Sequence, residues 1–131
     1  MPTRPLSPHL SVYQMSRYTL ATSIFNRLTG LALSAGLLLL VYWLMAVASG
    51  AAAHARAARL LSLPLMKLVY LALILAFSYH LVAGIRHLVW DSGHALERTQ
   101  SRRSAWLVVV LSLILTFGIA CGAWLAGIRT P

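Results

Sequence analysis

The sequence predicts an all-α integral membrane protein with three transmembrane helices. Hydrophobic residues make up 60% of the 131-residue chain and charged residues only 10%, whereas soluble domains have roughly 45–50% and 25%. Three stretches each reach the roughly 20 apolar residues that a helix needs to cross the hydrocarbon core. The net charge of +9 does not indicate a nucleic-acid-binding module, because its basic face would need a water-exposed scaffold.

The three predicted spans differ in the ionisable residues that they carry. The first, residues 28–48, and the third, residues 105–128, contain no charged side chain. The second, residues 65–90, has Lys67 near one end and two histidines and an arginine toward the other. All three are too long and too uniformly apolar for strands of a small barrel, so each is predicted to be a helix. Residues 1–131 therefore form a single membrane domain.

The basic residues predict the orientation of the chain. Three spans place the hydrophilic segment 1–27 and the link after the second span on one side of the membrane. More arginines lie on this side, which indicates a cytoplasmic N-terminus. This side carries seven basic residues, namely Arg4, Arg17, Arg27, Arg86, Arg98, Arg102 and Arg103. The opposite side carries four, namely Arg56, Arg59, Lys67 and Arg129.

The N-terminal segment lacks the features of a cleaved targeting peptide. Pro2, Pro5 and Pro8 would break the amphipathic helix of a mitochondrial transit peptide. No apolar region precedes the first span, as a secretory signal would require. We therefore expect the protein in a bacterial inner membrane, surrounded by lipid.

His80 is the residue that fits least well in a lipid-facing helix. It lies about ten residues from the nearer end of its span, roughly 15 Å deep at 1.5 Å per residue, and an imidazole at that depth is a candidate for function. Gly84 leaves the same helix face bare, so that a flat macrocycle can lie there. His87 follows on that face two turns later. We predict that His80 is an axial ligand of a b-type haem.

No second haem ligand is evident at the same depth on another span of this chain, so a partner chain is expected to supply it. The alternative is that His80 hydrogen-bonds across a helix pair and Gly84 allows close helix packing. In the same way, His87, next to Arg86, can simply reach toward the lipid headgroups.

Ser23 and Arg27, in the sequence SIFNR at the mouth of the first span, form a second candidate site. They are four residues apart and share one face if the helix has begun there. A hydroxyl and a guanidinium can both donate hydrogen bonds to the carbonyl oxygen of a quinone. The simpler interpretation is that Ser23 caps the helix and Arg27 anchors it at the interface. Asp91, at the end of the second span, can relay protons or pair with an arginine.

Three blocks of the sequence together resemble the large cytochrome b anchor subunit of succinate dehydrogenase. RPLSPHLSVY at residues 4–13 is similar to the opening of that family. SIFNRLTG at residues 23–30 resembles its Ser-x-x-His-Arg-x-(Thr/Ser)-Gly block. SYHLVAGIRHLVWDSG at residues 78–93 resembles its His-x(3)-Gly-x-Arg-His-x(3)-Asp block. The likeness extends over nearly the whole chain.

The resemblance implies a haem b- and quinone-binding membrane anchor of succinate:ubiquinone oxidoreductase. It implies a helical bundle shared with a second, smaller anchor subunit, which supplies the other haem ligand, and contacts with an iron–sulfur subunit and a flavoprotein subunit. His80 corresponds to the haem ligand, and Ser23 and Arg27 correspond to residues of the ubiquinone pocket. Arg86 and His87 match the second block and are expected among the haem surroundings, with Gly84. The chain is expected to contain no site for succinate itself.

Asn26 departs from the family pattern, which has histidine directly before the arginine. An asparagine amide donates hydrogen bonds but carries no charge near neutral pH, so altered electrostatics at the haem propionates are expected.

Three alternative functions stay open. They are a cofactor-free structural anchor, an anchor of a menaquinone-linked fumarate reductase, and a small transporter or channel.

Overall fold

The computed structural model describes residues 18–129, and every regular element in that range is an α-helix. Block 4–13 of the resemblance lies outside the described residues. The all-α prediction is confirmed. The helices, in chain order, are α1 (Tyr18–Ala48), α2 (Ala51–Leu61), α3 (Pro64–Asp91) and α4 (Arg98–Arg129).

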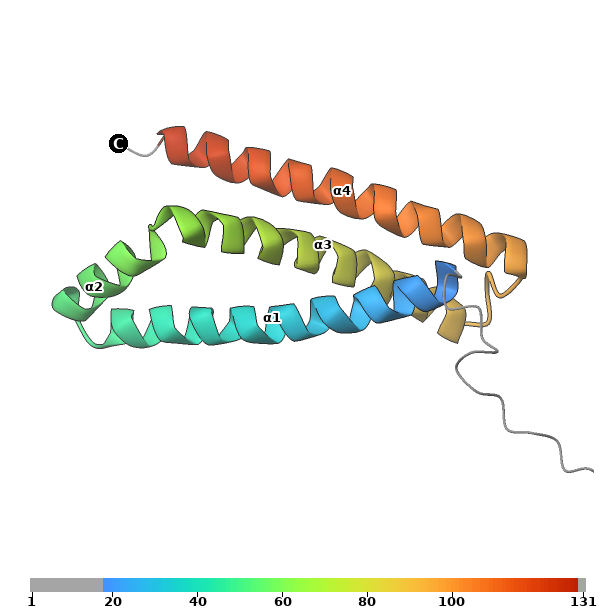
Figure 1. Ribbon diagram of the computed structural model, residues 1–131, viewed down its shortest axis with the longest axis horizontal. Helices are drawn as coiled ribbons and strands as arrows, with labels where there is room; N and C mark the ends of the chain where they lie inside the picture. Colours follow the sequence, from blue (N-terminus) through green and yellow to red (C-terminus); the bar gives the residue numbers. More distant parts are fainter. Residues whose placement is uncertain (1–17, 130–131) are drawn as a thin grey trace, which may run out of the picture.

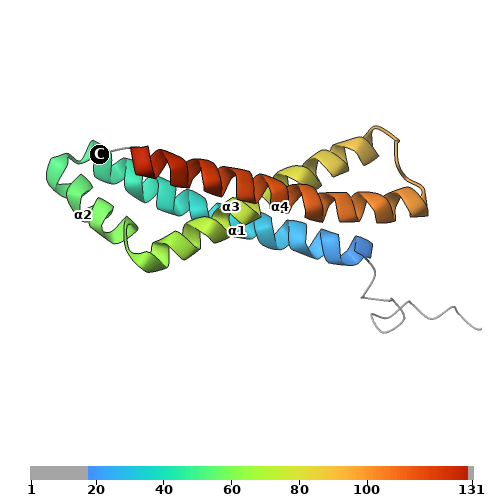
Figure 2. The ribbon, with the colours of Figure 1, turned by 90° about the horizontal axis from the view of Figure 1, so that it is seen from above.

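Three of these helices are long and apolar enough to cross a membrane, as the sequence predicts. The candidate spans are Leu20–Ala48, Pro64–Asp91 and Thr99–Gly127. The helices α1, α3 and α4 run alternately in opposite directions along the long axis of the molecule, with α3 in the middle (Figure 1). Seen from above, α3 crosses the other two helices at an angle (Figure 2).

The first and last spans begin earlier than expected. Helix α1 starts at Tyr18 rather than near residue 28, and α4 starts at Arg98 rather than near residue 105. Hydropathy locates the hydrocarbon core, whereas a helix continues beyond the core while its backbone groups bond to one another. Segment 1–27 is therefore partly helical, and Ser23 and Arg27 lie inside α1 rather than at its mouth.

Helix α2 connects α1 to α3 and was not predicted from the sequence. Gly50 precedes it with a φ of 96°, which suits glycine, and Pro64 occupies the first turn of α3. Ala57 is completely buried, while Arg56 and Arg59 on other faces are exposed. A short helix with one buried and one basic face is typical of the membrane–water interface.

Small side chains fill the packing between the long helices. The Ser112 hydroxyl, for example, lies 3.5 Å from the carbonyl oxygen of Ser78, which joins α4 to α3. Small residues let helix backbones approach closely in a membrane, where the hydrophobic effect does not drive association. The buried small residues of α3 and α4 are Ala76, Ser78, Ala83, Ser101, Ala105 and Ser112.

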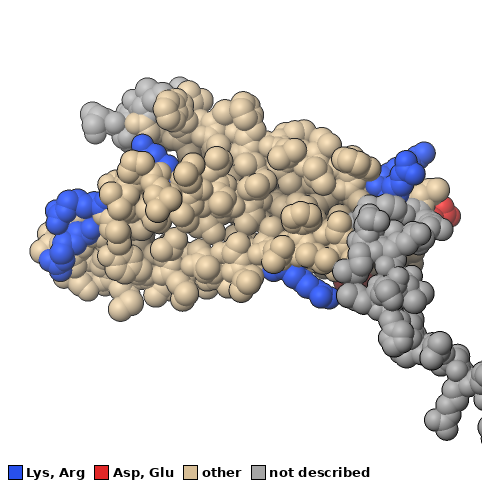
Figure 3. Space-filling model, in the orientation of Figure 1, with Lys and Arg blue, Asp and Glu red and all other residues tan. Residues whose placement is uncertain are grey.

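The surface agrees with a membrane-spanning bundle. Large apolar side chains are widely exposed along all three long helices, for example Leu38 at 70%, Phe117 at 72% and Trp124 at 72%. On the face in view, lysine and arginine lie toward the two ends, with a broad uncharged band between them (Figure 3). Lipid is the solvent that such a band requires.

Candidate haem and quinone site

The predicted site residues extend from the interior of the bundle, where His80 lies, to one of its ends. Helix α1 begins there, α3 ends at Asp91 and α4 begins at Arg98 (Figure 1); we call this the proximal end. Its residues come from different parts of the sequence, and α3 carries most of those with ionisable side chains. The predicted site residues are Ser23, Asn26 and Arg27 on α1 and His80, Gly84, Arg86, His87 and Asp91 on α3.

His80 is half-buried and faces α1. Its Nδ1 atom lies 3.1 Å from the backbone carbonyl oxygen of Asn26 and 3.3 Å from the hydroxyl of Thr29. A carbonyl oxygen can only accept a hydrogen bond, so the contact with Asn26 requires a proton on Nδ1. The neutral ring then keeps a lone pair on Nε2, which is the arrangement that metal-ligating histidines commonly have.

The surroundings of His80 leave room for a large flat group. A Cβ atom added at Gly84 would meet nothing within 4 Å, so the α3 face next to the imidazole is open. The Oδ1 atom of Asn26 is buried and has no hydrogen-bond partner among the described residues. A free Nε2 lone pair, a bare helix face and an unpaired polar atom fit a haem with polar propionate groups.

Arg86 joins the three long helices at the proximal end. It is only 6% exposed, and its guanidinium donates to Thr22 of α1 at 3.1 Å. It also donates to the Ser104 hydroxyl at 2.9 Å and to the carbonyl oxygen of Ser101 at 3.0 Å, both in α4. The indole ring of Trp90 covers it at 3.9 Å. These partners are neutral, so cation–π contact and hydrogen bonds stabilise the buried charge.

We expect Arg86→Met to lower the stability of the bundle. Four hydrogen bonds link the guanidinium to α1 and α4, and interhelical bonds in membranes average about 0.6 kcal/mol each, so the loss is roughly 2 kcal/mol. Denaturant unfolding in detergent measures it. The matched control is Arg103→Met, at an exposed arginine of the same end. Equal stability of the two variants would contradict this role of Arg86.

His87 lies beyond Arg86 and is half-buried. Its ring stacks on Trp90, with 5.5 Å between the ring centroids. The Nδ1 atom is buried and has no hydrogen-bond partner among residues 18–129. The buried Nδ1 atom of His87 is therefore available to a polar group outside residues 18–129.

Ser23 and Arg27 lie on one face of α1, because the helix has already begun at Tyr18. Ser23 is half-buried and Arg27 is exposed. Asp91 is the exposed last residue of α3. Among the described residues, the guanidinium of Arg86 donates to Thr22, Ser101 and Ser104, and the role of Asp91 stays a prediction.

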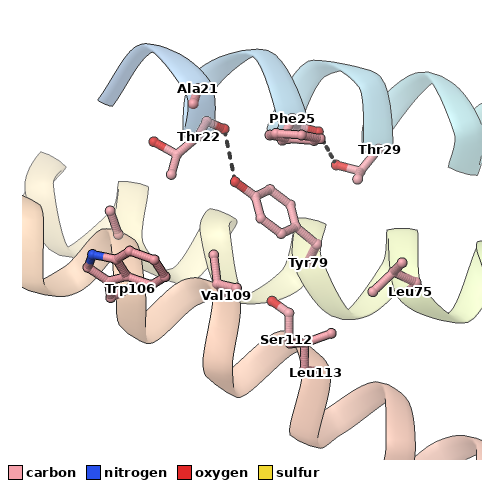
Figure 4. Close-up of a pocket in the computed structure, with 11 residues that line it drawn as sticks. Ala21, Thr22, Phe25, Thr29, Leu75, Tyr79, Trp106, Val109, Ser112 and Leu113 are labelled. Atoms are coloured by element: carbon pink, nitrogen blue, oxygen red, sulfur yellow. Dashed lines mark hydrogen bonds between the residues drawn. The ribbon is translucent and has the colours of Figure 1, made fainter. Parts of the chain in front are cut away.

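A cavity of about 450 Å³ lies on the other side of the α1–α3 contact, between α1, α3 and α4. Its lining is almost entirely apolar. The hydroxyl of Tyr79, one of the lining residues, donates to the carbonyl oxygen of Thr22 at 3.2 Å (Figure 4). Phe25 contacts Tyr79, with ring centroids 6.1 Å apart. Ser23 and Arg27 do not line this cavity. The lining residues Thr22 and Phe25 are on a different face of α1.

Comparison with known proteins identifies the family of the chain. A family described as succinate dehydrogenase/fumarate reductase transmembrane subunit matches residues 1–119. A succinate dehydrogenase cytochrome b556 subunit from Paracoccus denitrificans is 39% identical over 112 residues, 86% of this chain and 85% of the relative. The chain belongs to this family.

Two further relatives are also named succinate dehydrogenase cytochrome b subunits. The mitochondrial succinate dehydrogenase cytochrome b560 subunit of Bos taurus is 39% identical over 119 residues, 89% of this chain and 70% of the relative. The cytochrome b556 subunit of Rickettsia felis is 34% identical over 113 residues, 86% of this chain and 87% of the relative. The chain is therefore a multi-pass membrane subunit of an oxidoreductase complex and is not catalytic alone.

Several residues that form contacts between the long helices were not predicted from the sequence. Thr22, Thr29 and Tyr79 hold α1 against α3, and Ser101 and Ser104 hold the start of α4. The signal was present in the sequence, because each is a polar side chain within or beside an apolar span. However, serine and threonine often bond to their own helix backbone, so their presence alone does not indicate a contact between helices.

Proposed function

We propose that this chain binds a b-type haem through Nε2 of His80. The observation that carries the proposal is the pair of oxygens at Nδ1, which leaves the Nε2 lone pair for iron. The relatives named cytochrome b support it. The second axial ligand comes from a smaller anchor subunit, because among residues 18–129 the other histidines are either outside the spans or two turns away on α3.

The haem, when bound, supplies a one-electron store beside the path of electrons. The residues of this chain hold and orient it. His80 would bind the iron, Gly84 would leave space for the macrocycle, and the buried, unpaired polar atoms of Asn26 and His87 would be available to its polar groups. Arg86 belongs to the same surroundings, and its main contribution is to hold α1 and α4 in place.

Ser23 and Arg27 are proposed to line a ubiquinone pocket at the proximal end. Arg27 donates hydrogen bonds to a quinone carbonyl oxygen and stabilises the negative charge that develops there on reduction. The Ser23 hydroxyl is a second donor on the same helix face. Asp91, exposed at the end of α3, can pass protons from water to this region. Both Ser23 and Arg27 point away from the described cavity, so a partner subunit completes the pocket.

The proximal end is proposed to face the cytoplasm of a bacterium and to dock the other subunits. A flavoprotein oxidises succinate, and an iron–sulfur subunit delivers the electrons to ubiquinone at this end. The positive charge of the segments at this end supports the orientation. The family description also covers fumarate reductase, but the relatives named above are succinate dehydrogenase subunits, which favours succinate oxidation.

An optical difference spectrum of the purified complex tests the proposal. The tagged chain is isolated in detergent with its partner subunits and reduced first with succinate and then with dithionite. We expect a b-type haem spectrum, and its reduction by succinate would connect the haem to the dehydrogenase. An intact complex without a haem band would show instead that the chain is a cofactor-free anchor and that His80 packs helices together.

A further inference from the structure

Three groups of α1 surround one edge of the His80 imidazole. The carbonyl oxygen of Asn26 lies 3.1 Å from Nδ1, and the hydroxyl oxygen of Thr29 lies 3.3 Å from it. The third group is the backbone at Gly30, where an added Cβ would lie 3.1 Å from Cε1 of the ring. His80 itself is on α3, so these contacts depend on the packing of two helices.

The hydroxyl of Thr29 is arranged to accept rather than donate at His80. Its oxygen lies 2.8 Å from the carbonyl oxygen of Phe25 and 3.0 Å from that of Asn26, both in its own helix. A hydroxyl has one hydrogen, and a threonine within a helix normally donates it to such a carbonyl. The lone pairs of Thr29 then face Nδ1, where they can share its proton with the Asn26 carbonyl.

The close approach of the His80 ring, and not an unusual backbone conformation, requires glycine at position 30. A Cβ atom at 3.1 Å from Cε1 and 3.6 Å from Nδ1 is closer than ordinary van der Waals contact, so alanine would push the imidazole. The ring is attached to a packed helix and already hydrogen-bonded at Nδ1, which limits how far it can turn without breaking these bonds.

We propose that Thr29 and Gly30 are positioning residues for the axial ligand His80. Thr29, with the Asn26 carbonyl, fixes the proton on Nδ1 and directs Nε2 to the iron, and Gly30 permits the approach of the ring. The inference rests on the proposed haem function. Hydrogen-bond acceptors at Nδ1 make an imidazole more basic, which stabilises ferric over ferrous iron. Thr29 therefore lowers the midpoint potential of the haem.

The variant Thr29→Val tests this in the complete complex. Valine keeps the shape of threonine but removes the acceptor, so a redox titration followed at the haem band should give a higher midpoint potential, with unchanged haem content. Thr29→Ser should return the potential toward the wild-type value. The matched control is Thr116→Val, at an intramembrane threonine that donates to its own α4 backbone at 2.7 Å; its potential should not move.

Gly30→Ala tests the close approach independently. We expect a partial loss of haem or a high-spin component in the spectrum, because the displaced ring binds iron poorly. Gly118→Ala is the control, since a Cβ there meets nothing within 4 Å. Unchanged potentials in Thr29→Val together with an unchanged spectrum in Gly30→Ala would overturn the inference. Absence of haem from the wild-type complex would instead refute the proposed function, and the inference with it.

Discussion

Replacing His80 with leucine is expected to abolish the low-spin haem spectrum of the complex. Nε2 of His80 is the only iron ligand that we assign to this chain, so the iron would keep at most the ligand from the partner subunit. Leucine occupies a similar volume in the α1–α3 contact. The lost contacts at Nδ1 cost only about 0.6 kcal/mol each. Assembly of the complex should therefore survive, and the loss is spectroscopic.

The measurement is a low-temperature optical or paramagnetic resonance spectrum of the complex, with haem quantified per flavin. His54→Leu is the matched control, because His54 is an exposed histidine on α2, at the end of the bundle opposite the proximal end (Figure 1). Its spectrum should equal that of the wild type. A His80→Leu complex that retains a low-spin haem would show that another residue is the ligand.

The number and type of the long helices could be predicted from the sequence, because crossing a hydrocarbon layer imposes a length and a composition. The second span illustrates this well: residues 65–90 were expected, and α3 is Pro64–Asp91. The ends of α1 and α4 could not be predicted in the same way. Outside the hydrocarbon, polar residues such as Thr22 and Ser101 are compatible with both helix and coil.

Those earlier starts explain why the role of Arg86 was not foreseen. With a third span expected at residues 105–128, Arg86 had no α4 partner at its level and was expected only near the haem. Helix α4 in fact begins at Arg98, and its first turns bring Ser101 and Ser104 to the guanidinium. A contact between two helices can be predicted only if both helices are expected to extend to that level. An error in the start of α4 therefore left its contact with Arg86 unpredicted.

His80 was identifiable from the sequence because an ionisable side chain deep in a membrane span is rare and is a candidate for function. The residues of α1 that contact His80 could not be identified in the same way, because the sequence does not show which face of α1 packs against α3. The structure supplies that rotation and places Asn26, Thr29 and Gly30 against the ring. It also gives Asn26 an unexpected contribution, because the backbone carbonyl and not the side-chain amide contacts His80.

Arg27→Ala is expected to lower the rate of ubiquinone reduction by succinate about 100-fold, the usual effect of removing a donor from a developing oxyanion. Oxidation of succinate with a soluble dye as acceptor should stay near the wild-type rate, because the flavoprotein performs that step. Arg27 is exposed on α1, so the substitution removes no buried contact within residues 18–129. Both rates are measured on the same purified complex, normalised to flavin.

A matched pair of variants separates the charge of Arg27 from its geometry. Arg102→Ala removes an exposed arginine from α4 at the same end of the bundle, and its quinone reductase rate should change little. Arg27→Lys keeps the charge but not the planar fork of donors, so its rate should lie between those of the wild type and Arg27→Ala. If dye-linked and quinone-linked rates fell together in Arg27→Ala, Arg27 would be needed to dock the other subunits and not to bind quinone.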